Sequence, residues 1–340
     1  MSAQQFTRGP AMRDVAAAAG VSAQTVSRVL NEHPNVQDST RKRVLAVIED
    51  LGYRRNNTAR ALVTGRSKTI GVLTLATNNY SRSSLALGVE LGAREAGYTV
   101  NSVTSDLSVK GLTDAVSRLV FQGVDGIIIA APLQEAAEKI DKITSRIPTI
   151  NTDGSSDMGD RKVGVDQDIA AVLATKHLLE LGHKTVWHVS GPNEWSDAAS
   201  RLTSWRRTLQ EAGRDVPPVL HGDWSPESGY QNGLILGRMP EVTAIFVASD
   251  EMAFGVLRAL NELGRRVPED VSVVGIDDID LAAFSNPPLT TVRQSFEETG
   301  RRAVQQLVAY IADPSISTEP DLVSPTLIVR ASTAPPPDGK

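Results

Sequence analysis

The chain has 340 residues, of which 41% are hydrophobic and 22% are charged, a composition typical of globular proteins with two or three domains. It contains no cysteine, which excludes disulfides, iron–sulfur clusters and thiol catalysis. Its five histidines form no H-x-x-x-H pair, and no apolar run approaches the roughly 18 residues needed to cross a bilayer. The first residues lack the apolar core of a secretory signal. We therefore expect a cytoplasmic protein that uses no metal and no cofactor.

Positive charge is concentrated near the N-terminus. Residues 1–66 contain ten Arg and Lys against five Asp and Glu, so they carry +5, and the rest must carry −10 to give the total of −5. A small basic module on a large acidic body favours a polyanion as the partner of the module alone. A solvated, charged helix face would give the same count, so charge does not decide by itself.

Three short helical patterns follow one another in the basic module, and they favour a helix-turn-helix domain. Apolar residues recur at helical spacing over residues 12–19, 23–30 and about 38–52. Gly20 and Gly52 stand where the first and third helices should end, and Ser22 is a suitable N-cap for the second. A generic three-helix bundle would share these spacings.

The second helix has one apolar face and one face of short or polar side chains. The apolar side chains can pack on the first helix, which leaves a polar face of Ala23, Gln24, Ser27 and Arg28. Arg28 can bond both O6 and N7 of a guanine, and Gln24 can pair with an adenine edge. Groups suited to phosphate oxygens lie around this face, at Ser22, Thr25, Ser27, Thr40 and Arg41.

Residues 56–67 are expected to form a hinge helix and a linker. The segment is too short to be a stable isolated helix in water, so we expect it to become ordered on binding. Leu62 is an apolar residue among basic ones, and such a side chain can wedge into a minor-groove step. Packing between domains would also explain Leu62.

Several stretches within residues 12–62 resemble a known family. MRDVAAAAGVSAQTVSRVLN, TRKRV, LGYRRN and ARAL are similar to the headpiece and hinge of the lac repressor family of transcriptional regulators. The resemblance implies that Ala23, Gln24 and Arg28 read bases, and that Ala59 and Leu62 belong to a hinge helix in the minor groove. The full predicted DNA-binding set is Ser22, Ala23, Gln24, Thr25, Ser27, Arg28, Asn31, Thr40, Arg41, Asn56, Ala59 and Leu62.

From Lys68 on, short β-branched runs alternate with helical patterns, which predicts an α/β fold with parallel sheets. The runs are too many for one sheet, so we expect a body of two similar subdomains with a ligand cleft at the carboxyl ends of the strands. Those ends are polar in this sequence, with Asn79, Asp153, Ser249, Asp250, Asp277 and Asp278.

The family resemblance continues through the body, in VSGPNEWSDAASRLTSW, HGDWSPESGY, FVASDEMAFG, VSVVGIDDID and PPLTTVRQSF, and extends to periplasmic sugar-binding proteins. It implies an effector site formed by Leu75, Asn79, Asp153, Arg201, Trp224, Ser249, Asp277 and Gln294. These residue types suit a saccharide, because carboxylates and a guanidinium bind hydroxyls and an indole can cover the apolar face of a pyranose. A pair of aromatics placed to sandwich a flat purine is not apparent.

Each of these residues also has a purely structural explanation. Trp224 could be a packed aromatic under a loop, and Arg201 could be a surface ion-pair residue. Asp277 and Asp278 could cap a helix, as carboxylates at strand ends often do.

The predicted domain organisation follows from these patterns. It comprises a disordered arm at 1–11, a headpiece at 12–55, a hinge at 56–67, a body at 68–331 and a disordered tail at 332–340. Within the body, residues 68–166 and 296–324 should form one subdomain, and residues 167–295 and 325–331 the other.

The expected function is a transcriptional repressor that binds a pseudo-palindromic operator as a homodimer and responds to a small glycoside or disaccharide in the cleft. An activator or a corepressor-dependent regulator would look the same in sequence. The proline-rich end, APPPDGK, has no heptads, which favours a dimer over a higher oligomer. An enzyme is disfavoured because the motifs G-x-S-x-G, G-x-x-x-x-G-K and G-x-G-x-x-G are missing, and a secreted sugar carrier would have no use for Arg28.

Overall fold

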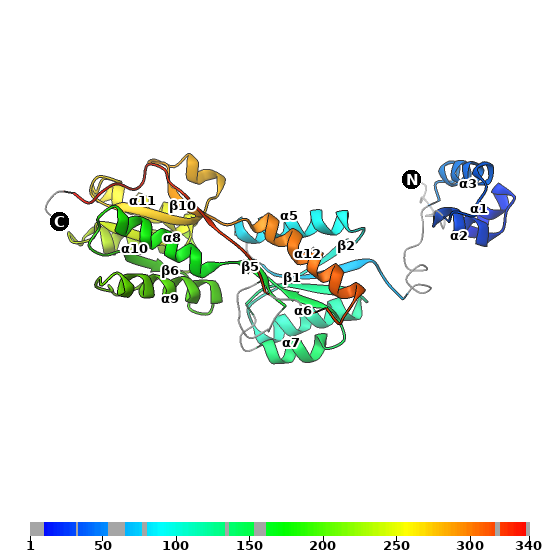
Figure 1. Ribbon diagram of the computed structural model, residues 1–340, viewed down its shortest axis with the longest axis horizontal. Coiled ribbons are helices and arrows are strands. Elements are labelled where there is room, and N and C mark those ends of the chain that lie inside the picture. The colour runs from blue at the N-terminus through cyan, green and yellow to red at the C-terminus, as the bar shows by residue number, and fades with distance from the viewer. Residues whose placement is uncertain are drawn as a thin grey trace, which may run out of the picture. The chain divides into compact units, whose positions relative to one another are not determined.

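The computed structural model describes residues 10–31, 33–53, 65–76, 80–132, 136–152, 161–316 and 320–337 (Figure 1). The chain divides into two compact units, Met1–Ser67 and Lys68–Lys340. This division falls where the sequence places the start of the body. No helix within the described ranges is both long and apolar enough to cross a membrane.

The described residues of the first unit form a domain of three helices, α1 (Met12–Ala19), α2 (Ala23–Leu30) and α3 (Asp38–Asp50). Gly20 ends α1 at φ 62°, a left-handed conformation that residues with a side chain rarely adopt. Ser22 caps α2 by accepting a hydrogen bond from the Thr25 backbone N–H at 3.1 Å. The apolar faces meet in one core, formed by Val15, Ala16, Ala19, Val26, Val29, Val44 and Tyr53. The predicted helix-turn-helix is therefore confirmed.

The start of this unit corrects the prediction of a disordered arm at 1–11. Of this arm, residues 1–9 lie outside the described part of the chain, whereas Ala11 is described and is the N-cap of α1. The backbone N–H of Ala11 donates to the Asp14 carboxylate at 2.7 Å. Because this bond satisfies a donor that the helix itself leaves open, Ala11 belongs to the folded domain.

The first subdomain of the body is built on a parallel sheet of order β2-β1-β3-β4. The strands are β1 (Thr69–Leu75), β2 (Thr99–Ser105), β3 (Gly126–Ala130) and β4 (Thr149–Asn151). The helices are α5 (Tyr80–Glu95), α6 (Val109–Phe121), α7 (Ala137–Thr144) and α12 (Phe296–Ala312). α6 and α7 cover one face of the sheet and α5 and α12 the other, so β3 is buried along its whole length (Figure 1).

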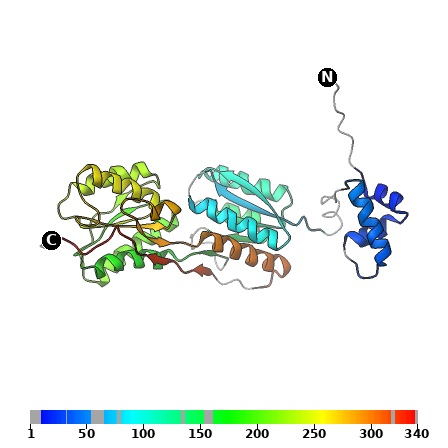
Figure 2. The same cartoon turned by 90° about the horizontal axis from the view of Figure 1, so that it is seen from above.

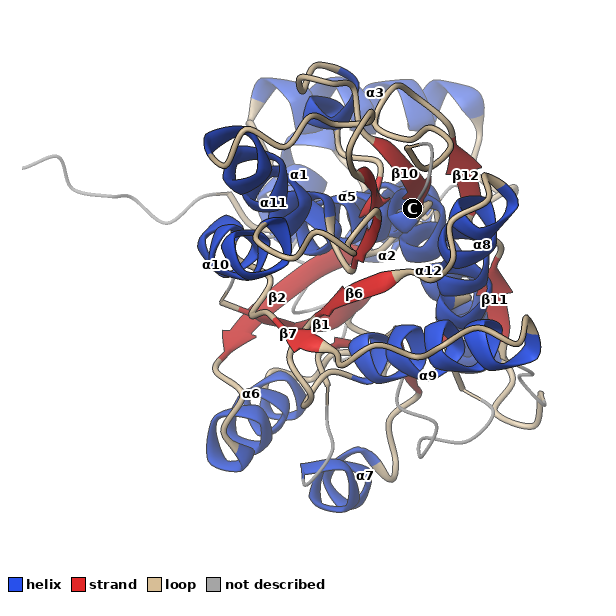
Figure 3. Cartoon of the chain, turned by 90° about the vertical axis from the view of Figure 1, so that its left-hand side faces the viewer, coloured by secondary structure: helices blue, strands red, loops and turns tan. Residues whose placement is uncertain are grey.

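The second subdomain contains a sheet of order β12-β10-β9-β8-β6-β7, in which only the β10–β12 pair is antiparallel. The strands are β6 (Trp187–Ser190), β7 (Leu220–His221), β8 (Ala244–Val247), β9 (Ser272–Asp277), β10 (Thr290–Arg293) and β12 (Thr326–Ile328). The helices are α8 (Gln167–Glu180), α9 (Ser196–Glu211), α10 (Pro226–Gly237) and α11 (Asp250–Glu262), with a short 3-10 helix, η3 (Asp280–Ala283). α8 and α9 lie on one side of the sheet and α10 and α11 on the other (Figure 3).

The chain passes between the subdomains three times. It leaves the first after β5 (Val163–Val165), returns between β10 and α12, and leaves again after β11 (Asp321–Val323). β5 and β11 pair in parallel, and the segment that follows β11 runs on to β12 (Figure 2). The predicted subdomain boundaries at 166, 295 and 324 fall within these three connections.

Several elements were not predicted from the sequence. β5, β7, β10, β11 and β12 span two to four residues each, which is too short to show a period-two pattern. Helix α12 was included in the first subdomain but not recognised as a helix. It packs closely on α5, because a side chain at Gly88 would overlap the backbone of Glu297 and one at Gly300 would overlap the backbone of Leu85.

The predicted disordered tail is wrong for the residues the structure describes, 332–337. Ser332 is fully buried, and its hydroxyl accepts from the Thr290 N–H at 2.8 Å and donates to the Val273 carbonyl at 2.6 Å. Ala334 exchanges hydrogen bonds with the Ser272 hydroxyl, donating its N–H at 3.0 Å and accepting at 2.9 Å. The segment is ordered because it supplies hydrogen-bond partners to backbone and hydroxyl groups of the second subdomain. The proline content of the tail does not reveal these bonds.

This docking predicts the effect of one substitution on stability. Ser332→Ala leaves the buried Thr290 N–H without its acceptor, so the free energy of unfolding should fall by about 1–3 kcal/mol. Urea denaturation measures the change. Ser324→Ala, at an exposed serine of the preceding connection, is the control and should change stability by less than about 0.5 kcal/mol. Equal stability of the two variants would mean that the Ser332 hydroxyl contributes nothing to the stability of the fold.

Candidate functional site

Helix α2 presents the predicted base-reading residues on its outer face. Ala23, Gln24 and Arg28 are exposed, whereas Val26 and Val29 are buried against the other helices. Thus the side chains that can read bases occupy the face that packing leaves free.

The residues predicted to contact phosphates lie beside this face. Ser22 is exposed, and its Oγ lies 3.0 Å from the Thr25 hydroxyl, so both hydroxyls are at the start of α2. Arg41 donates to the His33 carbonyl at 2.8 Å, which fixes the loop before α3 with one of its five N–H donors. Thr40 is half-buried and Asn31 donates to the Ser27 hydroxyl at 3.4 Å. Three further predicted DNA contacts, Asn56, Ala59 and Leu62, lie outside the described residues.

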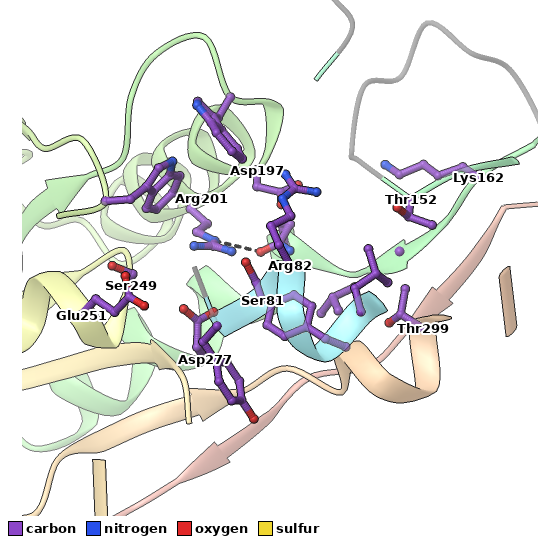
Figure 4. Close-up of a pocket in the computed structure, with 18 residues that line it drawn as sticks. Ser81, Arg82, Thr152, Lys162, Asp197, Arg201, Ser249, Glu251, Asp277 and Thr299 are labelled. Atoms are coloured by element: carbon purple, nitrogen blue, oxygen red, sulfur yellow. Dashed lines mark hydrogen bonds between the residues drawn. The ribbon is translucent and has the colours of Figure 1, made fainter. Parts of the chain in front are cut away.

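The body contains a pocket between its two subdomains, where residues that follow strands of both sheets come together. Its empty space is about 790 Å³ when the open solvent at its mouth is counted. Arg201, Asp277 and Ser249 from the second subdomain face Ser81, Arg82 and Thr152 from the first (Figure 4).

Arg201, on α9, is a buried positive charge in the pocket wall. Only 4% of the residue is exposed, so its guanidinium must find partners within the protein. Nε donates to the Gln167 side-chain oxygen at 2.8 Å and Nη1 donates to the Ala248 carbonyl at 2.5 Å. The guanidinium also lies 5.6 Å from the centre of the Trp224 ring. Arg201 is therefore not a surface ion-pair residue.

Asp277, the last residue of β9, places a carboxyl group beside Arg201. Desolvation raises the pKa of Asp277 to about 8, against the opposing effects of the Arg201 charge and of a hydrogen bond from Gln294 Nε2 at 2.6 Å. Its φ of 126° is one that residues with a side chain rarely adopt, and strained backbone of this kind is often found at ligand sites.

Asp278 has a different role from its neighbour. Its side chain is only 5% exposed and is held by Arg293 at 2.7 Å and Arg330 at 2.5 Å. These arginines belong to β10 and to the segment after β12, so Asp278 fastens the edge of the sheet. Asp277 remains directed at the pocket.

Two tryptophans, Trp195 and Trp224, contribute aromatic rings to the pocket. Trp224 adopts φ 72° and its ring covers Gly191 so closely that a Cβ there would overlap it. The Trp224 indole N–H is buried and has no hydrogen-bond partner among the described residues. The Trp195 ring lies 5.8 Å from that of Trp224 at 79°, and Arg82 lies over Trp195 at 5.0 Å. The pocket thus offers ring faces in two directions.

Ser249 and Glu251 occupy the start of α11. The Ser249 hydroxyl accepts from the Met252 N–H at 3.3 Å as the helix cap, and the residue also lines the pocket. Burial raises the pKa of Glu251, and a hydrogen bond from the backbone of Tyr80 partly offsets this effect. Since Tyr80 begins α5 of the first subdomain, Glu251 makes a polar contact across the pocket.

The structure brings together half of the predicted effector residues. Arg201, Trp224, Ser249 and Asp277 line the pocket, and Gln294 lies behind Asp277. Leu75 corrects the prediction, because its side chain is 4% exposed and packs in the core beneath the pocket, as expected for a strand covered on both faces. Two predicted residues, Asn79 and Asp153, lie outside the described part of the chain.

Several lining residues were missed from the sequence. They include the first turn of α5, the loop after β6 and the start of α12, at Tyr80, Ser81, Arg82, Trp195 and Phe296. Trp195 could have been found, since it follows the carboxyl end of β6, where ligands of such folds bind. Phe296 could not, because α12 was not recognised.

A helix-turn-helix unit joined to a body with two parallel-sheet subdomains and a polar pocket defines a ligand-regulated DNA-binding protein. Residues 11–56 match the lacI family of bacterial regulatory proteins, and residues 175–333 match a periplasmic binding protein-like domain. The chain is 32% identical over 332 residues to the ribose operon repressor of Escherichia coli K12, covering 94% of this chain and 99% of that protein.

Two further comparisons agree. The HTH-type transcriptional repressor PurR of Pasteurella multocida is 32% identical over 327 residues, covering 94% of this chain and 98% of that protein. A crystal structure of the Lac repressor dimer bound to operator and the anti-inducer ONPF matches with a TM-score of 0.90 at 32% identity, covering 96% of this chain and 100% of that one. The chain belongs to the LacI family of bacterial regulatory proteins, and it is a DNA-binding regulator, not an enzyme.

The raised pKa of Asp277 predicts a pH dependence of stability. Because the folded state holds the Asp277 proton up to a pKa of about 8, whereas the unfolded chain releases it near 3.8, the contribution of Asp277 should be most favourable below pH 3.8. It should fall as the pH rises between these two values. Asp277→Asn removes this titration, so the stability of the wild-type protein relative to the variant should decline from about pH 5 to about pH 8 in urea denaturation. If the stability of the wild-type protein and of Asp277→Asn changed with pH in the same way, the raised pKa of Asp277 would be contradicted.

Proposed function

We propose that the protein is a transcriptional repressor whose affinity for a pseudo-palindromic operator is controlled by a small saccharide, a glycoside or a disaccharide, in the pocket of the body. The observation that carries the proposal is the joint placement of Arg201, Asp277 and Trp224 in one wall of that pocket. The relatives are named repressors, and the matching Lac repressor dimer is bound to an operator.

The chemistry of the pocket supports a saccharide more than a flat base. A guanidinium and a carboxyl group can bind adjacent hydroxyls, and a tryptophan face can cover the C–H face of a sugar ring. A purine held between aromatics would need two roughly parallel rings. Among the described lining residues, the Trp195–Trp224 pair meets at 79° and the Tyr80–Phe296 pair at 71°. Ring faces in different directions suit a ligand with two rings.

A homodimer fits the DNA side of the proposal. A two-fold symmetric pair of headpieces would meet the two half-sites of a pseudo-palindrome. In each headpiece the exposed Arg28 and Gln24 would read base edges, while hydroxyls at the start of α2 contact phosphates. Effector binding would change the angle between the subdomains and shift the protein away from the state that binds DNA.

An activator or a corepressor-dependent regulator would use the same residues, and a direct selection distinguishes them. Operator DNA is selected from a random pool, and the bound DNA is challenged with glucose, galactose, ribose, lactose and cellobiose in turn. Release by one sugar identifies an inducer and supports the proposal. Tighter retention supports the corepressor version, and failure to enrich any DNA contradicts the DNA-binding role.

The base-reading face predicts the effect of Arg28→Ala. Loss of a bidentate contact to guanine should cost about 1–3 kcal/mol of operator binding and remove discrimination at one base pair. Arg43→Ala removes the same charge from an exposed position on α3 and should weaken binding to all sequences alike. Binding measured across single-base operator variants separates these results. An Arg28→Ala profile that parallels that of Arg43→Ala would exclude Arg28 as a base reader.

The pocket predicts the effect of Trp224→Ala. The variant should bind operator as the wild-type protein does. The sugar concentration needed to change operator binding should rise by at least about tenfold, because the sugar ring loses its contact with the Trp224 indole. Tyr230→Phe is the control, since Tyr230 bonds Glu262 at 2.6 Å on the surface of α10 and α11. An unchanged sugar response in Trp224→Ala would place the effector elsewhere.

A further inference from the structure

Four polar side chains form a continuous chain of hydrogen bonds behind the pocket. Arg201 Nε donates to Gln167 Oε1 at 2.8 Å, Gln167 Nε2 donates to Gln294 Oε1 at 2.8 Å, and Gln294 Nε2 donates to Asp277 Oδ1 at 2.6 Å. We name this set, Arg201–Gln167–Gln294–Asp277, the amide relay. Gln167 and Gln294 are 8% and 4% exposed, so water cannot readily replace these bonds.

The direction of the amide relay follows from its first member. An arginine has only donors, so the atom of Gln167 that faces Arg201 must be the carbonyl oxygen. The amide nitrogen of Gln167 must then face Gln294 and donate to its carbonyl oxygen. The amide nitrogen of Gln294 is therefore the atom that faces Asp277. Each amide thus has one favourable orientation, and Asp277 Oδ1 is engaged as an acceptor. Oδ2 is the Asp277 oxygen left for a ligand.

The amide relay also joins two of the three connections between the subdomains. Gln167 is the first residue of α8, directly after the connection from β5. Gln294 lies between β10 and α12, in the returning connection. The Gln167–Gln294 bond therefore links two chain segments that must both move if the angle between the subdomains changes. The same two residues hold Arg201 and Asp277, which face the pocket.

We propose that Gln167 is a positioning residue for the effector response: it orients Arg201 and, through Gln294, Asp277, and it ties both to the connections between the subdomains. This proposal rests on the proposed function, because it concerns how an effector in that pocket is sensed. A ligand that displaces Arg201 or Asp277 breaks a hydrogen bond of Gln167 or Gln294. The side-chain amides of these two residues are buried, and leaving one of their polar groups unpaired costs about 1–3 kcal/mol. The amide relay thus converts a contact in the pocket into a change at the connections.

The first test measures coupling in the full-length protein. Coupling is the ratio of operator dissociation constants with and without saturating sugar, taken from the panel of glucose, galactose, ribose, lactose and cellobiose. Gln167→Met keeps the length of the side chain and removes both of its hydrogen-bonding groups, and it should reduce this ratio by about 3- to 30-fold. Gln306→Met, the same change at a glutamine of α12 outside the amide relay, is the matched control and should leave the ratio unchanged.

A double-mutant cycle separates a relay from two independent structural losses. If Gln167 and Gln294 act as one chain, Gln167→Met/Gln294→Met should reduce coupling no further than the more severe single variant. If the two residues contribute independently, the reduction in coupling in the double variant should equal the product of the two single reductions. Urea denaturation of the same variants shows whether the loss of coupling follows the loss of stability, which a merely structural role would require.

The possible results show whether the proposed function fails or only the role of the amide relay. If no sugar of the panel changes operator binding by the wild-type protein, both the proposed function and the role of the amide relay are contradicted. If the wild-type protein responds and Gln167→Met responds equally, or if the two substitutions multiply, only the amide relay is contradicted. Reduced coupling in Gln167→Met with an unchanged Gln306→Met control and a non-additive double variant supports the inference.

Discussion

Burial of the Asp277 carboxyl group beside Arg201 is the constraint on which the arrangement of this pocket wall depends. Burial makes the charged form of Asp277 costly, which is why its pKa rises to about 8, and it makes every unpaired donor on Arg201 costly as well. Arg201 donates hydrogen bonds to Gln167 and to the Ala248 carbonyl, and Asp277 accepts one from Gln294. A ligand that engages Arg201 or Asp277 must compete with those bonds.

The topology explains why this interaction can influence the whole body. Asp277 ends β9, and ligands of doubly wound folds bind beyond the carboxyl ends of their strands. The chain passes between the subdomains three times, so neither subdomain can rotate without moving those connections. Pocket, connections and sheet ends therefore occupy one region of the body, which is where a ligand would have to act to change the angle between the subdomains.

Much of this could be predicted from the sequence, and the failures have physical causes. Arg201, Trp224, Ser249 and Asp277 were predicted because each lies in a stretch that resembles the family, and the headpiece helices because caps and apolar spacing agree. The Gln167–Gln294 bond joins residues 127 positions apart, and no local pattern reports such a contact. Leu75 was misplaced because a strand buried on both faces gives no sign of which side chains reach the pocket. The tail at 332–337 was judged from its prolines, whereas Ser332 is ordered by bonds to distant strands.

The central claim is that occupation of the pocket and binding of operator are thermodynamically linked. The most direct test measures two ratios for every sugar of the panel that binds the protein in calorimetry: operator affinity with and without that sugar, and sugar affinity with and without operator. Linkage requires the two ratios to be equal, and a typical coupling of about 1–3 kcal/mol corresponds to a change of about 5- to 150-fold in each. A sugar that binds the pocket in calorimetry but leaves operator affinity unchanged would contradict the account.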